Sequence, residues 1–165
     1  AAGAGLTDPL LLEGIGRFDD VSAGVACVIF GGWLEKYPGL RIIATAGGGA
    51  LALMVERLDR AYRAPHWGGA RPNGERGWPI SRPPSTFLRQ ILVDTAPPSR
   101  LALRAALAAF GSDRVLFGTD SPPLPDVVGD GLRAVAEVSP SEEQRQAICH
   151  ENAARLFTRP VHAAT

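Results

Sequence analysis

The sequence predicts an α/β fold in which short buried strands alternate with amphipathic helices. Apolar runs of strand length occur at residues 40–45, 91–93 and 115–118, and a segment with apolar residues at helical spacing follows each run. This alternation favours parallel strands joined by right-handed crossovers. A sheet of only these strands would have two open edges, so the pattern is typical of a piece of a larger, closed sheet.

Length and composition predict a single domain over residues 1–165 and exclude some classes of partner. The chain is 45% hydrophobic with a net charge of +0, which argues against nucleic acid and anionic membranes as partners. No apolar run approaches the ~20 residues that span a bilayer. Cys27 and Cys149 make no metal-type spacing. They are interpreted as reduced core thiols of a cytoplasmic protein, and a disulfide is the alternative.

The predicted elements before the middle of the chain are a helix, a strand and a second helix. Residues 1–18 are Gly-rich and predict a loop-like start with at most one helical turn. A helix is expected from Asp19, with apolar residues recurring to Trp33 and a stop at 37–39. The strand 40–45 leads into a helix that ends near Arg63.

The glycine run between that strand and its helix, Gly47 to Gly49, permits close approach of the backbone. Phosphate binding is one use of such a turn. The run has neither the Lys-Ser/Thr of a P-loop nor the glycine spacing of a dinucleotide fingerprint, so a phosphate site is not the favoured interpretation.

Residues 64–83 form an irregular segment rich in Pro, Gly, Arg and Trp. A loop of this length is either functional or an interaction surface. Its Trp67 and Trp78 lie near basic residues, a combination that stacks on bases in other proteins, but the neutral chain gives that interpretation little support.

The second half is predicted as helix 84–90, strand 91–93, helix 99–110, strand 115–118, helix 127–138 and a last helical stretch from Pro140. Residues 139–142 are interpreted as a capping box with Pro at the first helical position. Phe117 is expected in the core of a central strand. The tail 158–165 is expected to be frayed.

The candidate functional residue is Asp120, which follows strand 115–118 directly. An acid just past the carboxyl end of a buried parallel strand points into the crevice where α/β folds hold their ligands. A turn or helix-capping carboxylate is the alternative. Asp94 follows strand 91–93 in the same way.

Five segments carry a resemblance to a known family: residues 35–50 (EKYPGLRIIATAGGGA), 84–89 (PSTFLR), 93–95 (VDT), 113–120 (DRVLFGTD) and 152–157 (NAARLF). Their order and spacing resemble the amidohydrolase-related group typified by aminocarboxymuconate-semialdehyde decarboxylase, over about residues 19–157. The resemblance implies a metal-dependent (β/α)8 TIM-type barrel that decarboxylates or hydrolyses small carboxylate or aromatic substrates. It also implies that the three strands are the sixth, seventh and eighth of that barrel, so the chain would be its C-terminal part.

Family roles transfer only to matching positions. Asp120 matches the acid after the last strand, which in the family binds the metal and can serve in proton transfer. Ala46 stands where the family has its catalytic His, and a methyl group can neither accept a proton nor polarise a water. The His-x-His of the first strand and the His of the fifth would lie before residue 1.

Zinc is the expected metal of the complete barrel, and this chain alone is expected to bind none. A catalytic zinc needs about three protein ligands. His66, His150 and His162 lie in a long loop, a helix and the tail, and none follows a strand. Asp94 and Asp120 together would make at most a weak site.

The first functional hypothesis is therefore the C-terminal half of a metal-dependent decarboxylase or hydrolase, inactive alone. Its N-terminal half would be another polypeptide or would have been removed. The chain is expected to associate, either as a homo-oligomer or with that complementary half. The second is a catalytically inert relative that binds a ligand or serves as a scaffold, which Ala46 favours. The third is an interaction module that uses segment 64–83 as its surface.

Overall fold

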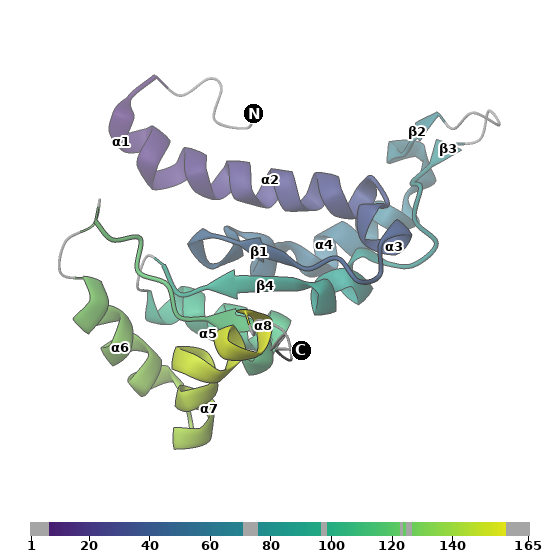
Figure 1. Ribbon diagram of the computed structural model, residues 1–165. Coiled ribbons are helices and arrows are strands. Elements are labelled where there is room, and N and C mark those ends of the chain that lie inside the picture. Colours follow the sequence, from purple (N-terminus) through teal and green to yellow (C-terminus); the bar gives the residue numbers. More distant parts are fainter. Residues whose placement is uncertain (1–6, 71–75, 97–98, 123, 125–126, 158–165) are drawn as a thin grey trace, which may run out of the picture.

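A three-stranded parallel sheet organises the chain. The computed structural model describes residues 7–157 except 71–75, 97–98, 123 and 125–126. Strands β1 (Ile42–Ala44), β4 (Ile91–Asp94) and β5 (Val115–Leu116) lie in the order β1-β4-β5, and both pairs are parallel (Figure 1). The α/β class and the parallel pairing predicted from the sequence are confirmed.

Helices connect and flank these strands. In chain order the α- and π-helical segments are α1 (Pro9–Leu11), η2 (Leu12–Gly16), α2 (Arg17–Phe30), α3 (Trp33–Lys36), α4 (Leu51–Arg63), α5 (Arg100–Phe110), α6 (Val127–Val138), α7 (Glu142–Gln146), η7 (Ala147–Glu151) and α8 (Asn152–Phe157). Short 3-10 turns are η3 (Ala46–Gly48), η4 (Pro65–Trp67), η5 (Pro84–Gln90) and η6 (Ser112–Arg114). Strands β2 (Gly69–Ala70) and β3 (Arg76–Gly77) form a separate antiparallel hairpin.

The two faces of the sheet have different roles. Side chains alternate along a strand, and register partners in parallel strands share a face. Ala44, Val93 and Val115 lie in register, and all three belong to the buried core. The opposite face carries Ile43 beside Leu92, and Asp94 beside Leu116.

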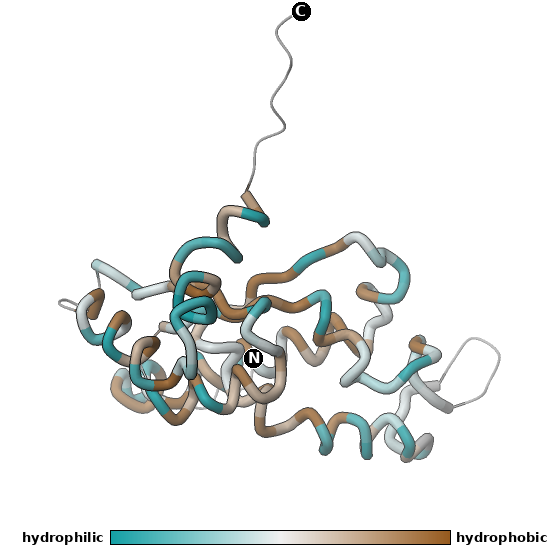
Figure 2. Tube along the Cα trace, turned by 90° about the horizontal axis from the view of Figure 1, so that it is seen from below, coloured by the Kyte–Doolittle hydropathy of each residue, from teal (hydrophilic) through white to brown (hydrophobic). Residues whose placement is uncertain are grey.

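The core joins one sheet face to the helices. It includes Ile29 of α2, Leu51 of α4, Phe110 of α5, Val135 of α6 and Ile148 of η7, all at most 3% exposed. Figure 2 shows the matching alternation of hydrophobic and hydrophilic segments along the helical tubes. The core face is thus shared by helices from both halves of the chain, whereas Ile43 on the other face stays 41% exposed.

The start of the chain differs from the expected loop. The helical path begins at Pro9 and continues through the π-turn η2 into α2. Asp8 caps it, because its carboxylate accepts the backbone N–H of Leu10 at 2.8 Å. The glycines at 14 and 16 argued against a helix in the sequence, but Gly16 is buried inside this one.

The first predicted helix is also divided. Gly31 ends α2 and Gly32 has a φ of 77°, which glycine adopts at little cost. A Cβ at residue 32 would lie 2.7 Å from the carbonyl oxygen of Pro79. The chain therefore turns there, and Trp33 begins the separate helix α3 with its side chain 54% exposed.

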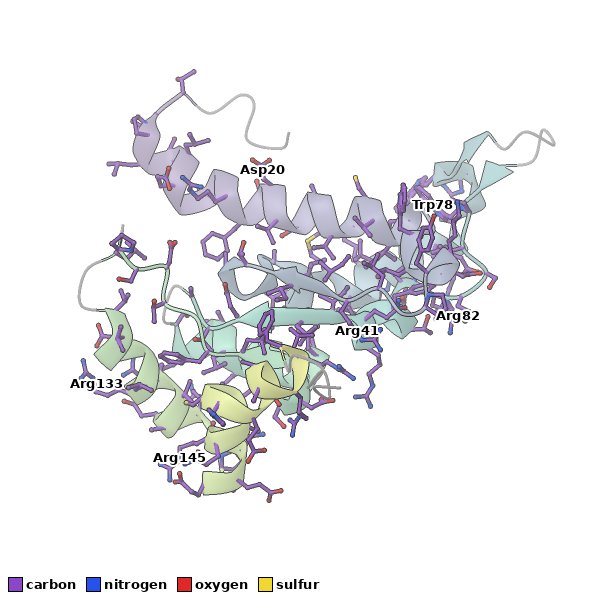
Figure 3. All side chains as sticks on the ribbon, viewed as in Figure 1. Asp20, Arg41, Trp78, Arg82, Arg133 and Arg145 are labelled. Atoms are coloured by element: carbon purple, nitrogen blue, oxygen red, sulfur yellow. The ribbon has the colours of Figure 1, made fainter. Side chains whose placement is uncertain are left out.

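Segment 64–83 is more regular than predicted, because it contains η4 and the β2–β3 hairpin. Trp78 fixes the base of the hairpin: its ring lies 4.3 Å from that of Phe30, and its indole N–H donates to the carbonyl of Ala61 at 3.3 Å. Figure 3 shows Trp78 beside the C-terminal end of α2. This tryptophan is a packing residue.

Three smaller predictions need correction. The cap of the last helical stretch is Ser141, whose hydroxyl accepts the N–H of Gln144 at 3.2 Å, and not Ser139. Phe117 lies beyond β5, donates its N–H to Ile148, and is only partly buried against the core. Both cysteines are free, but Cys27 is exposed and Cys149 half-buried, so neither is a core thiol. The predicted frayed tail 158–165 lies outside the described residues.

Candidate functional site

The carboxyl ends of the three parallel strands lie together at one end of the sheet, here called its C-terminal edge. Thr45 and Ala46 follow β1, Thr95 follows β4, and Asp120 lies a few residues beyond β5. Parallel strands place all their carboxyl ends together, and this edge is where α/β folds hold ligands. Arg41 lies at the opposite end of β1 (Figure 3).

Two residues at this edge have an unusual backbone. Ala46 has a φ of 53° and Asp120 a φ of 56°, and no other non-glycine residue in the described part of the chain has a positive φ. The left-handed region costs roughly 1–2 kcal/mol for a residue with a Cβ. Strain of this kind concentrates at functional sites. The two positions singled out from the sequence are therefore also the two strained ones.

Asp94 is the half-buried carboxylate of the site. Its Oδ1 accepts the N–H of Gly47 at 2.9 Å and the N–H of Ala96 at 3.2 Å. Burial raises the pKa of Asp94, these backbone N–H groups oppose the rise, and the negative charge of Asp120 adds to it. The structure thus brings Asp94 and Asp120 into electrostatic contact.

Asp120 itself is exposed. Its charge also acts on Arg17, because the pKa of Arg17 is raised first by its hydrogen bond to Glu13 and additionally by Asp120. Asp120 is therefore exposed to solvent and acts electrostatically on Asp94 at the end of β4 and on Arg17 of α2.

A buried hydroxyl joins the two strand ends that carry the acids. Thr95 is 7% exposed, and its Oγ1 donates to the carbonyl of Gly118 at 2.9 Å and accepts the N–H of Gly118 at 3.1 Å. Two bonds to one residue fix β4 relative to β5 just before the chain reaches Asp120.

The glycine turn after β1 has its amides occupied. The N–H groups of residues 47 to 50 donate in turn to Asp94 Oδ1, the carbonyl of Thr45, the carbonyl of Ala46 and Ser22 Oγ. A phosphate cradle requires free amides that point at the ligand. The glycines instead allow close packing: a Cβ on Gly49 would lie 2.4 Å from the carbonyl oxygen of Phe18, and one on Gly48 would lie 2.8 Å from Val93.

A small cavity of about 120 Å³ lies beside this turn. Its lining combines the site residues Ala46 and Asp94 with Phe18 of α2 and residues of α5. Phe18 was missed in the sequence because the Gly-rich residues before it predicted a loop. The available signal was its spacing to Ser22, one helical turn later.

The residues of this chain do not make a metal site by themselves. No group of three or more His, Cys, Asp or Glu side chains suited to a metal occurs among the described residues. His66 lies in η4 and His150 in η7, both exposed, and His162 lies outside the described residues. Asp94 and Asp120 supply two carboxylates, and the methyl group of Ala46 adds no donor.

Several residues of the recognised motifs hold the fold together. Asn152, 3% exposed, donates to the carbonyls of Ser112 at 2.7 Å and Val115 at 2.8 Å, which fixes the start of β5. Ser85 donates its N–H and hydroxyl to the carboxylate of Asp59 on α4. These motif residues explain why the strand ends are placed where they are.

Comparison with known proteins identifies the family. The model of the amidohydrolase family matches residues 19–159, so the chain belongs to that family. A 2-amino-3-carboxymuconate-6-semialdehyde decarboxylase of Dictyostelium discoideum is 25% identical over 132 residues, which are 79% of this chain and 35% of the relative.

Solved structures of decarboxylases are also similar to this chain. A manganese-containing 5-carboxyvanillate decarboxylase of Novosphingobium aromaticivorans is 26% identical with a TM-score of 0.74. The match covers 92% of this chain and 44% of the decarboxylase chain. A manganese-containing dihydroxybenzoic acid decarboxylase of Polaromonas is 25% identical with a TM-score of 0.68, over 85% of this chain and 40% of its own. The chain therefore spans less than half the length of each of these relatives. In the part of the chain that the structure describes, no helix is long and apolar enough to cross a membrane.

Proposed function

We propose that this chain forms the C-terminal part of the barrel of a divalent-metal-dependent decarboxylase of small aromatic carboxylates. In this proposal β1, β4 and β5 are the sixth, seventh and eighth barrel strands. Asp120 is one ligand of the metal, and residues outside this sequence supply the others. The observation that carries the proposal is the meeting of Ala46, Asp94 and Asp120 at the carboxyl ends of parallel strands in an amidohydrolase-family chain.

The sheet geometry supports a barrel segment over a doubly wound sheet. A doubly wound sheet is covered by helices on both faces, whereas a barrel keeps its helices outside and its strands' other face toward the interior. Here the helix-covered core takes Ala44, Val93 and Val115 from one face. On the other face Leu92 and Leu116 are buried, whereas Ile43 at the edge strand is 41% exposed. The remaining strands of a barrel would pair with the open edges of the sheet at β1 and β5, and this second face would line the barrel interior.

The metal is proposed from the relatives and from the chemistry of the ligands. Manganese is bound in the two decarboxylases described above, and carboxylates suit Mn²⁺ as well as Zn²⁺. Zinc stays a prediction, as do hydrolase activity and a cytoplasmic location.

A second candidate is a catalytically inert relative that keeps the fold and binds a ligand. Ala46 favours it, because its methyl group lines the mouth where the family resemblance places a catalytic His. In this candidate the strained backbone at residue 46 is a feature of the fold and has no catalytic partner.

The experiment joins this chain to the part of the Novosphingobium decarboxylase that it does not match. Manganese content and decarboxylation of 5-carboxyvanillate are measured for the chimera and for its variants. Asp120→Asn is expected to lose manganese, and Asp113→Asn, an exposed acid at the other end of β5, is the matched control and keeps it. Ala46→His is expected to raise the rate by ~10²–10⁴-fold, the usual worth of a positioned acid or base.

The outcomes separate the two candidates. A rate that exceeds background without the Ala46→His change favours the enzyme, and a rate that appears only with the change favours the inert relative. A chimera that folds and retains its manganese in the Asp120→Asn variant contradicts the assignment of Asp120.

A further inference from the structure

A hollow of about 540 Å³ lies at the end of the parallel sheet opposite the C-terminal edge. It is called the amino-end hollow here. Arg41 lines it directly before β1, and Asp113 and Arg114 line it directly before β5. Asn152 and Arg155 of α8 form another wall. All of its lining residues belong to the described part of the chain.

The amino-end hollow opens on the sheet face that the helices leave uncovered. Side chains alternate along a strand, and Val93 and Val115 both point into the helix-covered core. Their neighbours in the chain, Leu92 and Arg114, therefore belong to the opposite face, and both line the hollow. The hollow is thus separate from the helix-packed core and from the candidate functional site.

The side chains of the amino-end hollow carry an excess of positive charge. Three arginines line it with a single carboxylate, that of Asp113. This carboxylate is shared, because its Oδ2 lies 3.4 Å from Arg114 Nε and 3.7 Å from Nη1 of the nearby Arg89. Glu151, outside the lining, pairs with Arg155 at 3.5 Å. Four bases thus face two acids, which attracts anions to the hollow.

Hydrogen bonds place two of the guanidinium groups at the hollow. Arg155 donates from Nη2 to Oδ1 of Asn152, another lining residue. The Arg114 side chain is 25% exposed, and its Nε is buried. This Nε lies at ion-pair distance from Asp113 but makes no hydrogen bond in the described part of the chain. A buried donor without an acceptor is costly, so Arg114 favours an additional acceptor.

Arg41 adds donors from the other side of the sheet. Its Nη1 donates to the carbonyls of Pro38 and Leu40, at 3.1 Å each. These bonds hold the guanidinium group near the start of β1. Among the described residues no acceptor is bonded to its Nε or Nη2, so these N–H groups are available to a ligand.

Guanidinium groups bind carboxylates and phosphates through paired N–H donors. We propose that Arg41, Arg114 and Arg155 bind an oxyanion, a carboxylate or a phosphate, in the amino-end hollow. The volume exceeds that of one oxyanion, so the group belongs to a larger molecule or to a side chain.

Two sources supply this chemistry. One is a free anionic ligand, and the other is an acidic side chain of the barrel part outside this sequence. The second source rests on the proposed function. Residues 158–165, outside the described part, contain no Asp or Glu, so they provide no acidic side chain for the hollow.

The test titrates the ¹⁵N-labelled 165-residue chain with inorganic phosphate at about pH 7, where phosphate is anionic. Sodium chloride holds the ionic strength constant, so screening alone produces no shift. The Nε–H of Arg114 and the amide of Asn152 are expected to shift saturably, with a dissociation constant on the order of 1 mM. The amide of Gly47, at the C-terminal edge, is expected not to shift.

Variants assign the binding to the arginines. Arg114→Gln and Arg41→Gln are each expected to weaken binding at least ~5-fold, because each removes a charged donor. The amide of Asn152 reports on both. Arg60→Gln removes the same charge at an exposed position of α4 outside the hollow, and is expected to change the affinity less than about 2-fold.

The chimera described above distinguishes the two sources. Phosphate binding that persists in the chimera assigns a free ligand to the hollow. Binding that is present in the chain alone and lost in the chimera assigns an acidic side chain of the remaining barrel.

The chain alone decides the proposal, independently of the decarboxylase assignment. A titration in which the Asn152 amide shows no saturable shift overturns it. Unchanged affinity in folded Arg114→Gln and Arg41→Gln variants overturns it as well, and so does an equal loss of affinity in Arg60→Gln.

Discussion

At the scale of single residues, the site is marked by the unusual backbone conformation of Ala46 and Asp120. Both occupy the left-handed region, at φ 53° and 56°. Asp tolerates that region better than Ala, because its short polar side chain bonds locally. An alanine there has the strain of a Cβ without any such compensation, so residue 46 is a local weak point of stability.

Replacement of Ala46 by glycine is therefore expected to stabilise the chain. Removing the Cβ relieves roughly 1 kcal/mol of left-handed strain. The matched control is Ala23→Gly in the middle of α2, an exposed helical position, where the same change is expected to cost about 1 kcal/mol. Urea denaturation measures both. A destabilised Ala46→Gly variant would contradict the backbone geometry at residue 46.

Asp94 gives a pH dependence whose sign follows from its raised pKa. Its contribution to stability is present below the ordinary Asp pKa of 3.8 and is lost as the pH rises through the raised value in the folded chain. Asparagine keeps the Oδ1 acceptor and has no charge. The Asp94→Asn variant is therefore expected to match the unaltered chain at low pH and to become the more stable one as the pH rises.

Thermal denaturation across this pH range measures the difference between the two chains. Glu35→Gln serves as the control, because the N–H and hydroxyl of Ser81 lower the pKa of Glu35 and give any effect the opposite sign. A difference between Asp94→Asn and the unaltered chain that does not change with pH would show that the burial of Asp94 is unimportant.

At the scale of elements, hydrogen bonds between strand ends decide how the site is held. The strand β5 has only two residues, Val115 and Leu116, so its ladder with β4 is short. The chain then leaves the sheet, and the N–H of Phe117 goes to Ile148. Thr95 supplies the connection that the ladder lacks at Gly118.

Loss of the Thr95 hydroxyl is expected to loosen this end of the sheet. Thr95→Val keeps the shape but leaves the N–H and carbonyl of Gly118 without their partner, at a cost of about 1–3 kcal/mol. Amide hydrogen exchange at Gly118 is expected to accelerate. Thr86→Val, at an exposed hydroxyl that donates only to Pro83, is the matched control and should stay within ±0.5 kcal/mol. Slow exchange at Gly118 in the Thr95→Val variant would contradict this role.

The elements also show what the sequence can predict and what it cannot. The apolar runs predicted the three strands of the parallel sheet, because burial needs continuous hydrophobic residues. They did not predict the ends of these strands, which depend on pairing with a neighbour. The helical start at Pro9 was missed because the low helix propensity of Gly14 and Gly16 argued against a helix. In the structure, Gly16 is buried by tertiary packing. The cap moved from Ser139 to Ser141 because both serines satisfy the pattern and only tertiary packing chooses between them.

For the site, the sequence predicted Asp120 and Ala46 through the position of each after a strand and through family resemblance. The sequence could not predict the strained φ angles, the cavity or the hydrogen bond from Gly47 to Asp94. The cavity and the bond join residues far apart in the chain, and the φ angles depend on the surrounding fold, so no local sequence pattern records them.

At the scale of the whole molecule, the central claim is that this sheet is a segment of a barrel. Exposed apolar side chains are consistent with it: Ile43 is 41% exposed on the face away from the core, and Leu40 is 38% exposed just before β1. Burial of such apolar surface contributes about 25 cal/mol per Å². This contribution favours association of the chain with further strands or with another copy of itself.

The most direct measurement is sedimentation of the purified chain over a range of concentrations, together with ANS fluorescence. The account predicts self-association with bound ANS, and loss of both when the missing part of a barrel is supplied. Ile43→Lys is expected to weaken association, whereas Leu101→Lys, 78% exposed on the outer side of α5, is expected to leave it unchanged. A monodisperse monomer that binds no ANS at high concentration would contradict the claim.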